Sequence, residues 1–174
     1  MAMRASPPFR ADHVGSLLRS SALKDARARR EKNDITAEQL KAIEDREIEA
    51  IIKKQEAVGL KSITDGEYRR AFWNYDFLGK LDGVEAYLGE RKIKFQGKQP
   101  KPMMLRVIGK LGSYSTHPMI EHFKFVQAHT SQTVKMTIPS PSSLHFRYGR
   151  SAVPESIYPN MEDFYRALGQ SYRK

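Results

Sequence analysis

The sequence contains no cysteine among its 174 residues. Disulfides, thiolate ligands for zinc and cysteine nucleophiles are therefore excluded from this chain. It has one tryptophan, and no apolar run approaches the roughly 20 residues that a membrane-spanning helix needs. The first residues lack the apolar core of a secretory signal. We therefore expect a cytoplasmic protein with no membrane partner.

Acidic residues are almost missing from one segment. Residues 91–150 hold 11 Lys or Arg and a single acid, Glu121, and they account for the formal net charge of +10. Such a segment attracts anions: a phosphorylated or polycarboxylate ligand, nucleic acid or an acidic protein surface. It has few interleaved aromatics and matches no nucleic-acid-binding module, so nucleic acid is the less favoured partner. A non-catalytic anion- or nucleic-acid-binding module and a solvated face with no partner both stay open as alternatives.

Apolar strands alternate with helical segments along the chain. The helix after Thr36 is the best defined, because Thr36 and Gln39 form a capping box and Gly59 is placed to end it. Residues 83–102 lose this periodicity and predict a long loop or hairpin. We expect strands at 9–14, 60–64, 104–108 and 133–138, and helices at 17–34, 37–58, 69–81, 118–128 and 161–174.

This alternation predicts α/β architecture with parallel βαβ units in a single domain spanning residues 1–174. There are about four such units, with a long excursion after the second. A closed (β/α)8 barrel typically takes about 250 residues. The chain is therefore expected to form an incomplete (β/α)8 TIM-type barrel or a small open α/β sheet.

Function in such folds collects at the carboxyl ends of the strands. The first of these ends carries His13, Val14, Gly15 and Ser16. A glycine lets a ligand approach the backbone, and amides around Ser16 could hold a carboxylate or a phosphate. An ordinary strand-to-helix turn with Ser16 as a cap explains Gly15 and Ser16 unaided, and it is the favoured explanation of this dipeptide by itself.

The second strand end carries Asp65 and Glu67 on either side of Gly66. In an extended stretch, residues two apart point to one face. Two acids there could bind an ammonium group or a metal, or serve as a general base, and a helix start is the structural alternative. At the third end His145 is a candidate proton donor or substrate contact. A carboxylate-binding turn and an ammonium-binding acid together describe an amino-acid pocket.

These motifs match one family as a set. The stretches that carry the match are Phe9–Arg19, Ile63–Arg70 with Trp73, Asp76 and Phe77, Thr137–Ser142, and Tyr158–Asn160. Together they resemble the cobalamin-independent methionine synthase family, in particular the single-barrel branch related to that enzyme's C-terminal catalytic domain. The resemblance extends along nearly the whole chain.

The resemblance implies a (β/α)8 barrel that uses zinc to activate homocysteine as a thiolate, which attacks the methyl group of a folate-type donor. It assigns Val14, Gly15 and Ser16 to the turn that binds homocysteine. It assigns Glu67 to the homocysteine amino group. His13, Asp65 and His145 are further candidates for the site.

The resemblance also implies that part of the machinery lies elsewhere. The family's zinc ligands (His, Cys, Glu, Cys) belong to the second half of its barrel, and this sequence corresponds to the first half, as a truncated gene, a split gene or a fragment. We therefore expect no metal or cofactor in this chain, and no turnover by it alone. Whether the chain is itself an enzyme stays open. A second half-barrel chain, or self-association through unpaired strands, is the expected macromolecular partner.

Overall fold

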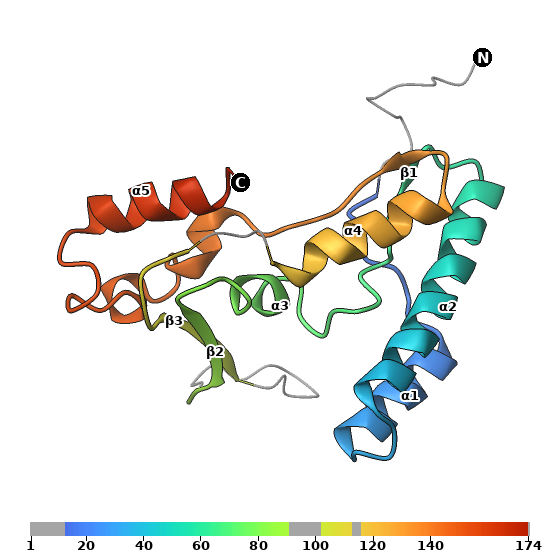
Figure 1. Ribbon diagram of the computed structural model, residues 1–174, viewed down its shortest axis with the longest axis horizontal. Coiled ribbons are helices and arrows are strands. Elements are labelled where there is room, and N and C mark those ends of the chain that lie inside the picture. The colour runs from blue at the N-terminus through green and yellow to red at the C-terminus, as the bar shows by residue number, and fades with distance from the viewer. Residues whose placement is uncertain (1–12, 91–101, 113–115, 174) are drawn as a thin grey trace. The chain divides into compact units, whose positions relative to one another are not determined.

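The structure is a computed structural model that describes residues 13–90, 102–112 and 116–173 (Figure 1). In chain order the elements are α1 (Ser21–Glu31), α2 (Ala37–Ala57), β1 (Ser62–Ile63), α3 (Tyr75–Leu78), β2 (Val84–Leu88), β3 (Met103–Val107), α4 (Pro118–His129), β4 (Thr133–Val134), the 3-10 turns η1 (Pro141–Leu144) and η2 (Gly149–Ala152), and α5 (Met161–Ser171).

The chain divides into two compact units. Unit 1 comprises Met1–Arg70 and Glu121–Thr137, and unit 2 comprises Ala71–Ile120 and Ile138–Lys174. Each unit has its own hydrophobic core.

In unit 1, helix α1 packs against helix α2 (Figure 1). Helix α2 has the expected capping box: the Thr36 hydroxyl accepts from the backbone N–H of Gln39, and the Gln39 side chain accepts from that of Thr36. Helix α1 begins at Ser21, later than expected, because the Ser20 side chain caps it by accepting from Leu23 N–H. The helices close over a core made of Leu23, Ile48, Ile52, Ile63, Tyr68 and Val126.

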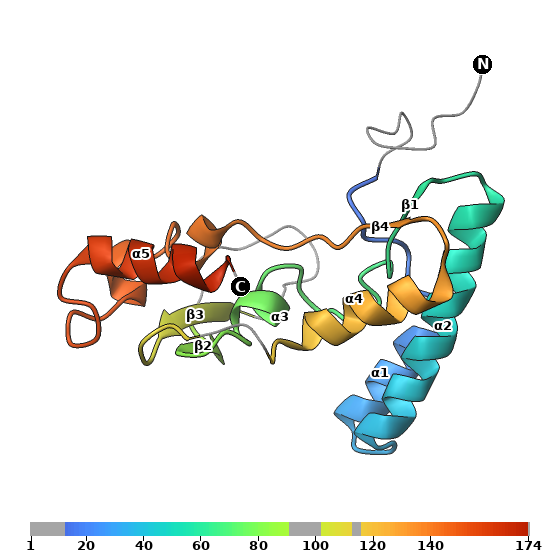
Figure 2. The same cartoon turned by 45° about the horizontal axis from the view of Figure 1, so that its top comes forward.

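Strands β1 and β4 form a parallel pair beside these helices (Figure 2). Ser62 is opposite Thr133 and Ile63 is opposite Val134. The ladder is shorter than the predicted strands 60–64 and 133–138, although the N–H of Lys135 still donates to the Ile63 carbonyl at 2.8 Å. The predicted strand 9–14 lies mostly outside the described residues, and its last two residues are not in a strand.

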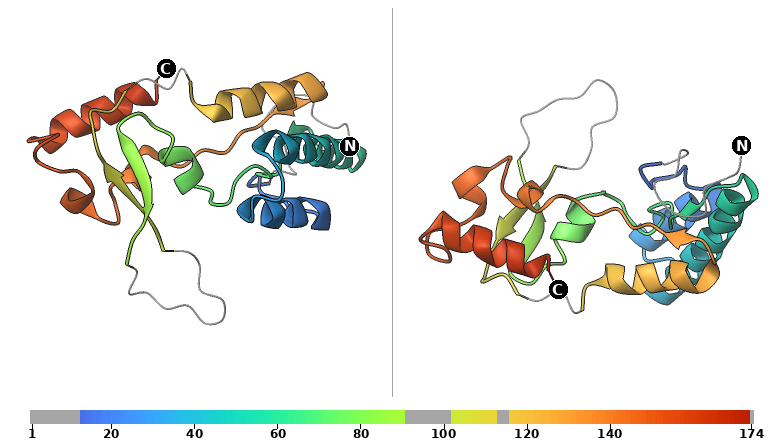
Figure 3. Two further views of the ribbon diagram at one scale, coloured as in Figure 1. Left: turned by 60° about the horizontal axis from the view of Figure 1, so that its bottom comes forward. Right: turned by 90° about the horizontal axis from the view of Figure 1, so that it is seen from above.

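In unit 2, strands β2 and β3 form an antiparallel pair, visible in both views of Figure 3. The register places Val84 opposite Val107 and Leu88 opposite Met103. The predicted strand 104–108 is therefore present, but its partner is antiparallel, which departs from the parallel βαβ pattern that we expected.

The helix predicted over 69–81 forms only between Tyr75 and Leu78. Ahead of it the Asp76 carboxylate accepts hydrogen bonds from the backbone N–H groups of Ala71 and Phe72. A side chain that takes backbone donors in this way competes with helix formation. The prediction of a longer helix was wrong for this reason.

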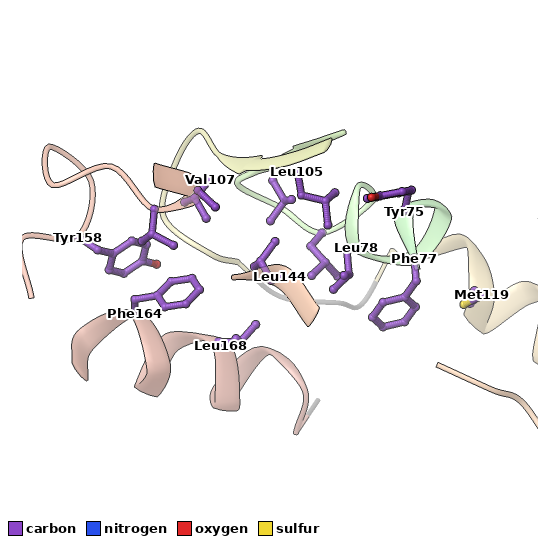
Figure 4. Packing of buried hydrophobic residues seen from close by; sticks show 14 residues of the cluster. Tyr75, Phe77, Leu78, Leu105, Val107, Met119, Leu144, Tyr158, Phe164 and Leu168 are labelled. Carbon is purple, nitrogen blue, oxygen red and sulfur yellow. The ribbon is translucent and has the colours of Figure 1, made fainter. Parts of the chain in front are cut away.

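The core of unit 2 is built from residues far apart in the sequence (Figure 4). Leu105 and Val107 of β3 face Phe164 and Leu168 of α5, with Leu144 between them. Helix α5 begins after Asn160, whose side chain accepts from Glu162 N–H at 2.9 Å. The observed fold of the described residues is a small α/β arrangement with few strands, and these residues form no closed barrel.

None of the helices in the described ranges combines the length and apolar character needed to cross a bilayer.

Candidate functional site

Unit 1 brings two of the three predicted strand ends together. The N–H of Leu17 donates to the Gly66 carbonyl at 3.0 Å. The Thr64 hydroxyl donates to the Gly15 carbonyl at 2.8 Å and accepts from Gly66 N–H at 3.1 Å. The segment that carries Gly15 and Ser16 is thereby fixed beside the segment that carries Glu67.

Gly15 is required at its position for two reasons. Its φ of 120° is disfavoured for residues that carry a side chain. A Cβ there would lie 2.6 Å from Oγ1 of Thr137, the oxygen that donates to the Val14 carbonyl, also at 2.6 Å. Gly15 itself is buried, whereas Val14 and Ser16 on either side are exposed. Ser16 is therefore exposed on a turn whose backbone is held by hydrogen bonds to the carbonyls of Val14 and Gly15.

The side chain of Gln55, from α2, holds the end of β1 in place. Its Nε2 donates to the Thr64 carbonyl at 2.9 Å and its Oε1 accepts from Thr64 N–H at 3.0 Å. Gln55 is only 3% exposed, so both backbone groups are satisfied away from solvent. This contact fixes the residue immediately before the two candidate acids.

Glu67 lies in a tight turn with an unusual backbone. Its φ is 57° and that of Gly66 is 67°, and Tyr68 N–H donates to the Asp65 carbonyl at 3.2 Å. Positive φ at both central residues characterises type I′ turns, where glycine, asparagine and aspartate are the usual occupants. A glutamate held in this conformation is strained, and strain of this kind concentrates at functional sites.

The Glu67 carboxylate is buried and paired. The side chain of Glu67 is 8% exposed, and its Oε1 lies 3.3 Å from Nη1 of Arg70, which is 3% exposed. The backbone carbonyl of Glu67 accepts from Arg19 at 2.7 Å. An anionic group is thus kept at the turn with its backbone and its charge both compensated.

Asp65 is also buried, but its geometry differs from the expectation. Its Oδ1 accepts from the N–H of Glu67 at 2.9 Å. The two acids are therefore in one tight turn and are not on one face of an extended stretch, as the sequence suggested. Among the described residues Oδ2 of Asp65 has no hydrogen-bond partner, although Asp65 is 2% exposed.

The two candidate histidines have structural surroundings of their own. In unit 1 the Nε2 of His13 lies 3.1 Å from the Ser62 carbonyl, and the His13 carbonyl accepts from Lys135. In unit 2 the ring of His145 lies against those of Phe164 and Tyr165, with centroids 5.4 and 5.1 Å apart. Burial lowers the pKa of His145 below its usual 6.5, which favours the neutral imidazole.

The residues present do not fit the zinc site implied by the family resemblance. The sequence has no cysteine. Across residues 13–90, 102–112 and 116–173, no group of three or more His, Asp or Glu side chains is placed to hold a metal ion. No step of the chemistry is therefore assigned here to a metal in this chain.

The basic residues of segment 91–150 that the structure describes are each in contact with a neighbour. Three of them pair with acids: Arg106 with Glu85 at 2.6 Å, Lys124 with Glu121 at 2.9 Å, and Arg150 with Glu155 at 3.6 Å. The remaining contacts are those of Lys110 with the Tyr158 ring, Lys135 with the His13 carbonyl, Arg147 with the Phe146 ring, and Arg150 with the Pro159 carbonyl. These contacts weaken the argument for an open anion-binding face.

The supporting residues were not identified from the sequence. Thr64 and Arg19 lie within the stretches that carry the family resemblance, but nothing in their spacing indicated which backbone groups they hold. Gln55 and Thr137 are distant in the chain from the groups that they bind. A contact between distant residues leaves no periodic pattern in a single sequence.

The family is established by comparison with known proteins. The sequence profile of the cobalamin-independent synthase catalytic domain matches residues 9–145, which includes both turns of the site in unit 1. This chain belongs to that family. A crystal structure of a putative vitamin-B12-independent methionine synthase from Listeria monocytogenes superposes with a TM-score of 0.77 and 42% identity, covering 95% of this chain and 46% of that one.

Two other proteins are similar to most of this chain. An uncharacterized Bacillus subtilis protein, YxjG, is 50% identical over 98% of this chain and 45% of its own length. A 5-methyltetrahydropteroyltriglutamate–homocysteine methyltransferase of Thermotoga petrophila is 24% identical over 86% of this chain and 20% of its own length. The chain therefore spans less than half the length of the relatives that it matches.

Proposed function

We propose that this chain supplies the homocysteine-binding part of a methionine-synthase-like methyltransferase. In this proposal the complete protein is a (β/α)8 barrel that transfers a methyl group from a folate-type donor to homocysteine, giving methionine. The chain contributes the turn at Val14, Gly15 and Ser16 and the acid Glu67. Membership of the family supports the reaction class.

The observation that carries the proposal is the turn at Glu67. A buried glutamate with a φ of 57° is maintained beside the Gly15 turn by the Leu17–Gly66 and Thr64–Gly15 hydrogen bonds. Glycine would fit this backbone with less strain. The Glu67 carboxylate already pairs with Arg70 through Oε1, and in this proposal the ammonium group of the amino-acid substrate is a second cation bound by the same carboxylate.

The Gly15 turn is suited to the other end of the same molecule. Ser16 is an exposed residue, and its hydroxyl and backbone N–H are donors of the kind that bind a carboxylate. Gly15 lets the backbone of this turn pack closely against Thr137 and Thr64, which holds Ser16 in place. An α-amino acid carries its ammonium and carboxylate on one carbon, which matches two adjacent turns with complementary groups.

The remaining chemistry is assigned to the rest of the protein. The chain spans 44–46% of the length of three relatives at 42–50% identity. In this proposal activation of the homocysteine thiol is placed outside this chain, which has no cysteine to bind zinc. Its own residues bind and orient the amino-acid end of the substrate, so turnover requires the missing part.

Calorimetric titration of the 174-residue chain with L-homocysteine tests the proposal. Two analogues serve as probes: 4-mercaptobutyrate, which lacks the ammonium group, and 3-mercaptopropylamine, which lacks the carboxylate. Each lost charge-assisted hydrogen bond should weaken binding by about tenfold or more. Equal affinity for all three compounds would contradict the proposal. For the full reaction, the chain joined to the remaining part of the B. subtilis relative should form methionine, and the chain alone should not.

A further inference from the structure

The turn that carries Glu67 is held from both sides of that residue's backbone. On one side Oδ1 of Asp65 accepts from the N–H of Glu67 at 2.9 Å. On the other side Nη2 of Arg19 donates to the Glu67 carbonyl at 2.7 Å and to the Arg70 carbonyl at 2.6 Å. Both contacts run from a side chain to the backbone of Glu67, so together they fix the position of the Cα from which the Glu67 side chain extends.

We propose that Asp65 and Arg19 are positioning residues, which act on the substrate through Glu67 and do not touch it themselves. The inference rests on the proposed function, in which Glu67 binds the ammonium group of homocysteine. It adds two residues whose effect on affinity should depend entirely on the presence of the Glu67 carboxylate.

The conformation of Glu67 supports this role for Asp65. A left-handed backbone is unfavourable for a residue with a side chain, and it persists only where surrounding contacts enforce it. The side chain of an aspartate two residues earlier stabilises such a turn by accepting the N–H of the later residue. An asparagine can make the same hydrogen bond, because its Oδ1 is also an acceptor.

The geometry of Arg19 supports the same role from the carbonyl side. Its guanidinium bridges the carbonyls of Glu67 and Arg70, the two residues whose side chains form the buried ion pair. The planar group donates in two directions at fixed angles, which a lysine ammonium on a flexible stem does not reproduce. Arg27 adds to this by donating to the Arg70 carbonyl at 2.9 Å and to that of Tyr68.

The test is a double-mutant cycle read by homocysteine affinity. Glu67→Gln should weaken binding by about ten- to a hundredfold. Asp65→Ala should weaken it by about tenfold, and Asp65→Asn should stay within about twofold of wild type, because the acceptor is retained. Asp65→Ala combined with Glu67→Gln should bind no more weakly than Glu67→Gln alone, since a residue that acts only through Glu67 has nothing left to position.

Two results would overturn the positioning role. If Asp65→Asn binds as weakly as Asp65→Ala, the carboxylate itself, with its unpartnered Oδ2, contacts the ligand. If the affinity losses of Asp65→Ala and Glu67→Gln multiply in the double variant, Asp65 acts independently of Glu67. Failure of the proposed function gives a different result, because Glu67→Gln would then leave homocysteine affinity unchanged. In that case the positioning role is decided by hydrogen exchange: it holds if Asp65→Ala by itself makes the Glu67 amide exchange faster, and it is wrong if the exchange rate stays the same.

Arg19→Lys gives a second cycle that does not depend on the folding of Asp65→Ala. It should weaken homocysteine binding by several-fold in the wild-type background and have no effect in the Glu67→Gln background. An effect of equal size in both backgrounds would overturn the role of Arg19. Matched controls are Asp25→Ala and Arg29→Lys, at exposed positions of α1. Neither should change affinity, and thermal unfolding confirms that each variant is folded.

Discussion

The hydroxyl of Thr64 donates a hydrogen bond to the carbonyl of Gly15, 49 positions earlier, at 2.8 Å. The same oxygen accepts from Gly66 N–H, so one side chain links both turns of the candidate site. In the proposed function the exposed Ser16 binds the carboxylate of the substrate and the buried Glu67 binds its ammonium group. This link makes the two turns a single structural feature of unit 1.

Gly15→Ala should destabilise the protein and weaken homocysteine binding. The substitution places a side chain on a backbone with φ of 120° and brings Cβ to 2.6 Å from Thr137 Oγ1. Such strain costs about 1–3 kcal/mol, before any clash with Thr137 is counted. Urea unfolding measures the stability, and calorimetry measures the affinity.

Gly59→Ala is the matched control for that substitution. Gly59 also has a positive φ, 84°, but a Cβ there would meet nothing within 4 Å. The Gly59→Ala variant should be less stable than wild type by about 1 kcal/mol, from backbone strain alone, and its homocysteine affinity should be unchanged. If both variants lose the same stability, the close approach of Gly15 to Thr137 is not important.

Gln55→Leu should be strongly destabilising. The leucine would leave the N–H and the carbonyl of Thr64 buried without their present partners. Each unsatisfied buried group costs about 1–3 kcal/mol, so we expect a loss of about 2–5 kcal/mol in the free energy of unfolding. Gln127→Leu, at an exposed position of α4, should change it by less than about 0.5 kcal/mol. Similar losses for the two variants would show that Gln55 does not stabilise β1.

Glu44 should make stability fall as pH rises above 4.5. Burial raises the pKa of Glu44 above its usual 4.5, and Arg27 and Arg69 oppose this shift only in part. Between the unfolded and folded pKa values the native state binds more protons, so the contribution of Glu44 is present below 4.5 and is lost as pH rises through the folded pKa. Glu44→Gln removes this dependence. The free energy of unfolding of this variant should therefore increase relative to that of wild type as pH rises.

Glu38→Gln gives the control of opposite sign. A hydrogen bond from Thr36 lowers the pKa of Glu38 below 4.5. Its contribution is therefore present above 4.5 and is lost as pH falls through the folded pKa. Unfolding curves between pH 3 and pH 7 should show that the free energy of unfolding of wild type increases relative to that of this variant as pH rises. The account of Glu44 fails if Glu44→Gln follows the same direction.

The sequence predicted those elements whose signals are local. Helix α2 is present with its capping box because Thr36 and Gln39 are three residues apart and need no other part of the chain. The strand at 103–107 is also present, since its apolar character is visible in the sequence. Its antiparallel pairing with β2 could not be predicted, because pairing depends on which segment meets it in the fold.

The same distinction explains the candidate site. The motifs containing Gly15 and Glu67 were visible, and the family resemblance gave them roles. Their proximity depends on the hydrogen bonds that Thr64 and Gly66 make to the Gly15 turn. The backbone of Glu67 is held by Arg19. All of these contacts join segments about 50 residues apart in the sequence. The helix expected over 69–81 is short for a related reason: Arg19 and Arg27 occupy the carbonyls of residues 67, 68 and 70, and Asp76 occupies the N–H groups of Ala71 and Phe72.

The central claim is that Glu67 binds the ammonium group of homocysteine, and one measurement tests it directly. Wild type and Glu67→Gln are each titrated with L-homocysteine and with 4-mercaptobutyrate, which lacks that group. Wild type should prefer homocysteine by about ten- to a hundredfold, the contribution of a hydrogen bond to a charged group. In Glu67→Gln the preference should fall to near unity, with the affinity for 4-mercaptobutyrate unchanged. If the variant keeps the wild-type preference, Glu67 does not bind the ammonium group.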